Sequence, residues 1–232
     1  IGCHLHPWSS PPFKKERLLE IKKTPFPNEY SDIVFEKKLI NLKNKLDEKF
    51  GPQEVYRAGR FGLSKSHIPI LSKHGFKVDT SITPGVNWDK TSGWRDNSGP
   101  DFSSYSTTPF YWKFNNEEIL LEIPITIINS ASETVKKVYQ KGGIYKKLGR
   151  ILGYKNEWLR PLPIKNDEKR LKDILYRCKK KGYEYSVLMM HSNEFHPKFN
   201  PYFNTDEKID YLFKNLGSLF YYSRQLGVIP TS

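Results

Sequence analysis

The sequence has few cysteines, no long apolar run and a shortage of acidic residues. Its two cysteines, Cys3 and Cys178, lie far apart and lack the C-x-x-C spacing, which argues against a disulfide framework and against a cysteine zinc site. No apolar run reaches the roughly 18 residues of a membrane-spanning helix, so we expect no membrane span. Two isolated cysteines are compatible with a reducing compartment, which slightly favours the cytoplasm and otherwise leaves the localisation open.

The first residues also lack the features of a complete N-terminus. No signal peptide is recognisable, and Ile1 is not an initiating methionine. We therefore expect an N-terminus that is processed, trimmed or incomplete.

Basic residues outnumber acidic ones, 38 to 25, which gives a formal net charge of +13. A chain with this charge can bind nucleic acid or an anionic surface. The densest basic stretches, 136–147 and 176–182, alternate with apolar residues at helical spacing, which is typical of solvated helix faces. No nucleic-acid recognition motif is present, so we predict no nucleic-acid partner.

The opening stretch, IGCHLHPWSSPPF (1–13), places His4 and His6 two positions apart. In an extended segment, residues i and i+2 project from the same side, so the two imidazoles could bind one metal ion. Two ligands do not complete a metal site. Surface or structural histidines remain the alternative unless other parts of the chain supply further ligands.

Apolar runs and amphipathic segments alternate along the chain. Helix 31–52 starts at a Ser31 or Asp32 cap and stops at Gly51-Pro52. Further helices are predicted at 66–75, 133–152 (continuous or broken), 166–182 and 205–227, and strands at 54–57, 76–81, 118–128, 185–191 and 228–230. Residues 82–117, with Trp88, Trp94 and Trp112, are predicted to form a long loop. This alternation predicts an α/β fold with a parallel sheet or an α/β barrel.

Three of the predicted strands end in a polar residue capable of chemistry. Arg57, Asp79 and His191 each follow an apolar run. Because α/β folds bind ligands at the carboxyl ends of their strands, these residues are candidates for one site.

Five segments occur in a specific order: HLHPW (4–8), YRAGRFG (56–62), GFKVDTSITPG (75–85), LLEIPIT (120–126) and LMMHSNEFHP (188–197). This set resembles the polysaccharide deacetylases of the NodB-homology type, in carbohydrate esterase family 4, and in particular their WalW-like subgroup. The resemblance runs from residue 1 to about residue 204. It implies a distorted (β/α) barrel that forms a single domain over residues 1–232. It also implies a divalent metal, usually zinc, and hydrolysis of acetyl groups from an acetylated polysaccharide or oligosaccharide.

The resemblance also implies roles for individual residues. His4 and His6 would be metal ligands, although the family places its second histidine four residues after the first, where this chain has Trp8. Arg57 would orient the general base and His191 would protonate the leaving group. The remaining candidates, which would contact substrate, are Arg60, Asp79 and Trp88. The family's first strand ends in two aspartates, one a metal ligand and one the base, and precedes the histidine segment, so we expect the chain to lack the first β/α unit.

Each role has a structural alternative. His191 could cap a strand end, and Arg57 could form an ion pair with Glu54 or Asp79. Asp79 could orient its loop through hydrogen bonds to nearby backbone. Trp88 could belong to a small core of its own loop.

Two functions compete with deacetylation. The departure from the family's histidine spacing favours a catalytically degenerate, carbohydrate-binding relative. The net charge favours a basic nucleic-acid-binding protein, which would bind DNA with a steep salt dependence.

Overall fold

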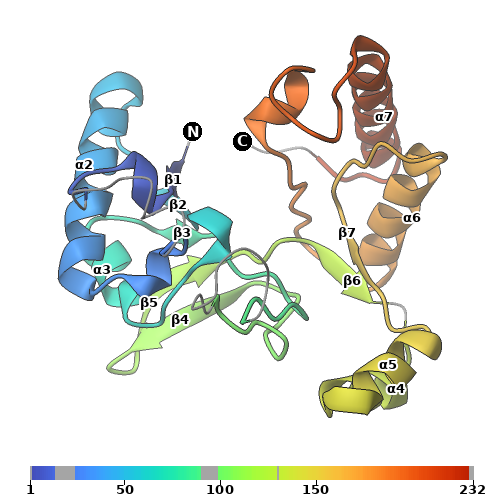
Figure 1. Cartoon of the computed structure of the whole chain (residues 1–232), viewed down its shortest axis with the longest axis horizontal. Coiled ribbons are helices and arrows are strands. Elements are labelled where there is room, and N and C mark those ends of the chain that lie inside the picture. Colours follow the sequence, from blue (N-terminus) through green and yellow to red (C-terminus); the bar gives the residue numbers. More distant parts are fainter. Residues whose placement is uncertain (1, 14–23, 90–98, 130, 230–232) are drawn as a thin grey trace. The chain divides into compact units, whose positions relative to one another are not determined.

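A computed structural model describes residues 2–13, 24–89, 99–129 and 131–229. The chain divides into two compact units, one up to Pro124 and the other from Ile125 (Figure 1). Within the described residues, no helix combines the length and the apolar character needed to cross a bilayer.

The first unit is built on a five-stranded sheet in the order β1-β2-β3-β5-β4 (Figure 1). Its strands are β1 (Cys3–Leu5), β2 (Val55–Ala58), β3 (Val78–Asp79), β4 (Phe110–Phe114) and β5 (Glu117–Glu122). All neighbours pair in parallel except β4 and β5, which are antiparallel. Helix α2 (Asp32–Phe50) connects β1 to β2, and α3 (His67–Lys73) connects β2 to β3. The prediction of an α/β fold with a mostly parallel sheet is confirmed.

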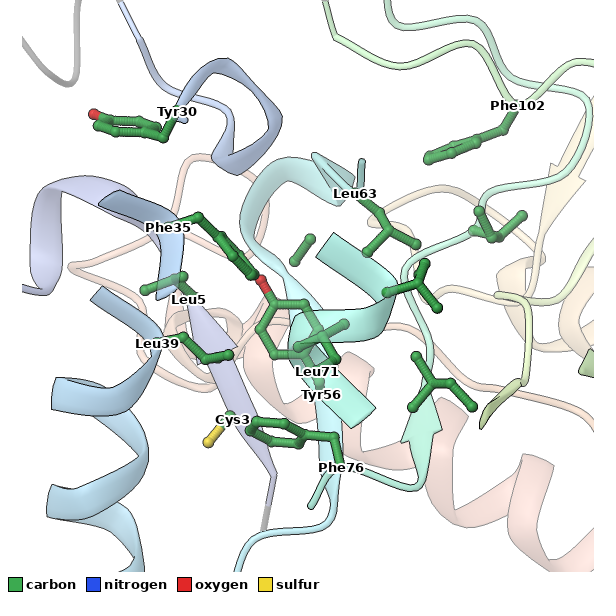
Figure 2. Packing of buried hydrophobic residues seen from close by; sticks show 14 residues of the cluster. Cys3, Leu5, Tyr30, Phe35, Leu39, Tyr56, Leu63, Leu71, Phe76 and Phe102 are labelled. Atoms are coloured by element: carbon green, nitrogen blue, oxygen red, sulfur yellow. The ribbon is translucent and has the colours of Figure 1, made fainter. Parts of the chain in front are cut away.

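The helices of this unit cover one face of the sheet. Successive strand residues point to opposite faces, and register partners in adjacent strands share a face. Cys3 and Tyr56 are register partners, and both belong to the buried cluster that includes Phe35 and Leu39 of α2. Figure 2 shows Tyr56 at the centre of this cluster, with the Phe35 and Phe76 rings beside it at centroid distances of 6.2 and 5.7 Å. We call this the core face of the sheet.

The second unit combines a two-stranded sheet with four helices. Strands β6 (Ile127–Asn129) and β7 (Asn156–Trp158) pair antiparallel. Helices α4 (Glu133–Gln140) and α5 (Gly143–Ile151) lie between them in sequence, and α6 (Asp167–Lys180) and α7 (Asp206–Gln225) follow. The main core consists of Ile128, Leu159, Leu171, Ile174, Leu175, Cys178 and Leu219.

Two predicted strands differ in the structure. The strand predicted at 118–128 is two strands, because Pro124 has no backbone N–H to donate and β5 ends at Glu122. The strand predicted at 185–191 is not formed. Of its backbone N–H groups, that of Val187 donates to the Thr126 hydroxyl and that of Met189 to the Leu159 carbonyl, so a side chain interrupts the ladder.

Two other predictions at loops and ends are corrected. The predicted loop 82–117 contains strand β4. The short strand predicted at 228–230 is absent from residues 228 and 229, where the Val228 N–H donates to the Ser223 carbonyl at the end of α7. Residue 230 and Trp94 lie outside the described residues.

Candidate functional site

The candidate site of the first unit lies on the sheet face opposite the core face. His4 and Arg57 are register partners at the carboxyl ends of β1 and β2, one position after the buried pair Cys3 and Tyr56. Alternation along the strands therefore turns both side chains away from the core face. Both are half-buried. The structure thus brings together two of the predicted site residues, from segments separated by about fifty positions.

The two histidines project from the same side, as the i, i+2 spacing predicts. Their ring centroids lie 4.5 Å apart with the planes at 76°. His4 Nδ1 lies 3.1 Å from the Arg57 carbonyl oxygen. Since a carbonyl only accepts, Nδ1 carries the hydrogen and Nε2 carries the lone pair. A backbone carbonyl that fixes the tautomer in this way is the usual second partner of a metal-binding imidazole.

The segment after β2 closes around the second histidine. It forms a 3-10 turn, Gly59–Phe61. A Cβ at position 59 would lie 2.5 Å from the Leu5 carbonyl oxygen and 2.6 Å from His6 Nδ1, so only glycine allows this approach. Arg60 follows with φ 51°, a left-handed conformation that costs a non-glycine residue energy and that clusters at functional sites. Its guanidinium lies over the Phe26 ring, 5.0 Å from the centroid.

Arg57 makes no ion pair with any residue that the structure describes. Burial alone lowers the pKa of its guanidinium from the ordinary value. The alternative of a structural ion pair is wrong, because Glu54 pairs with Lys77 at 2.5 Å and Asp79 bonds to other groups. A half-buried cation without a carboxylate is a favourable place for an anionic group to bind.

Asp79 lies on the core face, where it is fully buried. It pairs in register with Tyr56 and with Glu122, which is also fully buried. Its carboxylate accepts from the Ser81 backbone N–H at 3.0 Å and from the Ser81 hydroxyl at 2.6 Å. This geometry matches the loop-orienting alternative and does not bring Asp79 together with His4 and Arg57.

Asp79 and Glu122 form a coupled carboxyl pair that sequence reasoning missed. Burial raises the pKa of both, and the Asp79 charge raises that of Glu122 further. Glu122 accepts from the Ile82 backbone N–H at 3.0 Å and from Trp112 Nε1 at 3.1 Å. We assign the proton that the two carboxyl groups share to Glu122, because its pKa is raised more than that of Asp79.

Trp88 joins the turn at Gly59 to its own loop. Its ring stacks on Phe61 at a centroid distance of 5.6 Å, and its Nε1 donates to the Thr83 hydroxyl at 2.8 Å. The side chain is half-buried. This arrangement agrees with the alternative of a small loop core and leaves part of the indole exposed.

His191 belongs to the second unit. It is exposed and precedes a 3-10 turn, Ser192–Phe195, whose Glu194 is buried. Glu194 forms an ion pair with Arg160, and the Arg160 guanidinium lies 5.4 Å from the centre of the Tyr202 ring. These contacts fix the loop that carries His191. The glutamate three residues after the histidine in HSNEF was the available sequence signal for them.

The donor set fits part of a metal site. Two adjacent imidazoles, one with its tautomer fixed, suit two ligands of zinc. Among the described residues, no group of three or more histidine, cysteine, aspartate or glutamate side chains is arranged to hold a metal ion. His4 and His6 would therefore need at least one more ligand.

Comparison of the chain with models of known protein families, with curated proteins and with solved structures finds no match.

Proposed function

We propose that this chain is part of a metal-dependent carbohydrate deacetylase, a hydrolase that removes acetyl groups from a polysaccharide or oligosaccharide. One observation carries the proposal, namely the meeting of the HLHPW and YRAGRFG segments. His4 bonds to the Arg57 carbonyl, and the turn at Gly59 leaves room for His6 only because residue 59 has no side chain. The resemblance assigns metal binding to the first segment and positioning of the base to the second.

The fold supports the proposal in its strand order. Four parallel neighbours, β1-β2-β3-β5, are the arrangement from which a (β/α) barrel is built. In the proposed barrel, which would span residues 1–232 as one domain, the face of His4 and Arg57 is turned to the lumen. The core face packs against the surrounding helices, as α2 and α3 do here.

The proposed chemistry assigns one task to each residue. His4 and His6 would be this chain's ligands of a divalent metal, with zinc as the first candidate. That metal would supply polarisation of the acetyl carbonyl and a bound water of lowered pKa. Arg57 holds the base carboxylate by a bidentate pair, and the resemblance assigns that carboxylate to the aspartates expected before residue 1. Water would give one proton to this carboxylate and add to the acetyl carbon, and the C–N or C–O bond would break. The resemblance assigns to His191 the proton that the leaving amine or alcohol takes up as acetate is released.

The remaining predicted residues act around this centre. Arg60 and the exposed part of the Trp88 ring are proposed to contact the sugar, whose C–H face suits an indole. Asp79 is proposed to support the loop after β3 through Ser81, and to act on substrate only indirectly.

The experiment measures bound metal and acetate release in a protein extended upstream of residue 1, with acetylated chito-oligosaccharide as substrate. We expect one metal ion per chain and release of acetate. His191→Ala should lower release by about 100- to 10,000-fold and leave the metal bound. His4→Ala should remove both. The matched control is His196→Ala, which changes an exposed histidine of the same loop and should leave both unchanged.

The other outcomes separate the alternatives. If the extended protein binds no metal and releases no acetate but still binds the oligosaccharide, the degenerate carbohydrate-binding relative replaces the enzyme. The presence of Trp8 where the family has its second histidine favours that candidate. Binding to DNA that falls steeply with salt, with no oligosaccharide binding, would favour a nucleic-acid-binding protein.

A further inference from the structure

Helices α4 and α5 form a hairpin between β6 and β7 that is held together by its own contacts (Figure 1). Gly149 of α5 lies so close to α4 that an added Cβ would sit 2.7 Å from the Tyr139 Cβ. The Tyr139 and Tyr154 rings stack at 3.6 Å with an interplanar angle of 5°. The Ser132 hydroxyl caps α4 by accepting from the Val135 N–H. The hairpin is therefore a built element whose inner side is occupied.

The outer side of α5 presents apolar residues to solvent. Ile144, Leu148 and Ile151 are spaced i, i+4 and i+7, which places them on one face of the helix, and the C-cap residue Leu152 follows at i+8. Their exposed fractions are 76%, 43%, 81% and 51%. Such a stripe normally faces a core. Here no residue that the structure describes covers this apolar face, and the helix already packs through its other side.

The charge around this face has one sign. From residue 134 to residue 155 the sequence has no acidic residue, and its basic residues are Lys136, Lys137, Lys141, Lys146, Lys147, Arg150 and Lys155. Lys137, Lys147 and Arg150 are exposed. Lys141 lies with its Nζ 5.5 Å from the centre of the Tyr145 ring, which is itself 48% exposed. The apolar stripe and the basic residues therefore occur on the same short hairpin.

We propose that the α4–α5 hairpin docks on an anionic lipid surface. Aliphatic side chains on one helix face enter the boundary between headgroups and acyl chains, and lysines and arginines meet the lipid phosphates, which is how interfacial amphipathic helices bind. A second copy of the chain is a poorer occupant, because it would bring two sets of like charges together. This inference is independent of the proposed deacetylase function.

The experiment is co-sedimentation of the chain with vesicles of phosphatidylcholine alone and with vesicles that also contain phosphatidylglycerol. We expect binding to the mixed vesicles that weakens as salt is added. Ile144→Ser/Ile151→Ser should weaken this binding about tenfold or more, because the apolar insertion is lost. The matched control is Ile33→Ser, since Ile33 is 68% exposed on α2.

The charge component is tested by reversal. Lys137→Glu/Lys147→Glu should also weaken binding about tenfold or more. Its control is Lys180→Glu/Lys181→Glu, which reverses two exposed lysines of the other dense basic stretch. Circular dichroism of each variant checks that the helices are retained. The same substitutions in the protein extended upstream of residue 1 should leave acetate release from a soluble substrate unchanged, which separates this proposal from the proposed function.

Three results would overturn the proposal. Equal binding to both kinds of vesicle would remove the charge requirement. If Ile144→Ser/Ile151→Ser binds the mixed vesicles as the native chain does, the chain is attracted by charge alone and its apolar side chains do not insert. Concentration-dependent dimers that the serine variants abolish, without vesicle binding, would assign the face to a second copy.

Discussion

Lys38 is a buried cation that holds the histidine segment in place. It lies on α2 with 1% of its surface exposed. Its Nζ donates to the backbone carbonyls of Pro7, Ser10 and Pro12 at 2.8, 2.9 and 2.5 Å. The Tyr30 ring lies 5.2 Å from the same nitrogen. Lys38→Met keeps the length of the side chain and removes all three donors.

The size of the effect follows from the burial of the acceptors. Pro12 is exposed, so its carbonyl can turn to water, whereas Pro7 and Ser10 are buried. Each buried carbonyl left without a donor costs about 1–3 kcal/mol, or about 2–6 kcal/mol for the two. Two effects offset part of this cost. The variant no longer has to desolvate the Lys38 ammonium group, and the Met side chain packs in its place. We expect a net loss of about 3 kcal/mol in the free energy of unfolding.

Urea unfolding followed by tryptophan fluorescence measures this loss, since Trp8, Trp88, Trp94 and Trp112 all lie in the first 124 residues. A loss of about 3 kcal/mol lowers the unfolding midpoint by roughly 1 M urea. Lys37→Met, which changes the exposed neighbour, should stay within about 0.5 kcal/mol of the native chain. A loss below about 1 kcal/mol for Lys38→Met, or equal losses for the two variants, would refute the assigned role of Lys38.

Three further predictions concern charged groups of the first unit. Arg57→Met removes a half-buried cation that has no ion pair among the described residues, so the urea midpoint of unfolding should not fall. Acetate release by the extended protein should drop at least tenfold. A large fall in stability would contradict this assignment. Burial lowers the pKa of His67 to about 4, so the unfolded chain takes up a proton that the folded chain excludes, and stability should fall as the pH decreases from about 6.5 to 4. His67→Gln should remove about 3 kcal/mol of that change, measured as unfolding free energies across the range, and an unaltered pH profile would count against it. Burial raises the pKa of Asp79 and Glu122, so the folded chain retains a proton that the unfolded chain releases, and stability should fall as the pH rises above about 4.5 and through the folded pKa. Asp79→Asn should flatten this second slope above about pH 4.5, and a slope equal to that of the native chain would show that the pair does not share a proton.

Local signals predicted the helices of the chain well. Helix α2 begins after Ser31 and ends at Gly51, whose φ of 79° suits glycine, as the cap and stop signals indicate. Its apolar stripe was predicted less well. Leu39 is fully buried, but Ile33 is 68% exposed, because it lies two positions before the buried Phe35 and therefore on nearly the opposite side of the helix.

The strands were harder to predict, because their limits depend on pairing partners that are distant in sequence. Strand β4 was missed although Asn115 and Asn116, with φ of 51° and 68°, form a tight connection to β5. Two asparagines between short aromatic and apolar runs are a known signal for a two-residue hairpin turn. The run at 185–191 has the composition of a strand, but a threonine hydroxyl bonds where a neighbouring backbone carbonyl would be needed.

The candidate site shows most clearly what strand ends alone can predict. Arg57 and Asp79 both follow an apolar run, and the parallel sheet does bring them to the same edge. Asp79, however, pairs in register with Tyr56, one position before Arg57, and a shift of one position turns a side chain to the other face. Asp79 consequently lies under the helices, where Ser81 and Glu122 satisfy it, and Arg57 shares a half-buried face with His4. The end of a strand thus predicts the edge of the sheet, and only the register decides whether a polar residue there stabilises the core or remains open to a ligand.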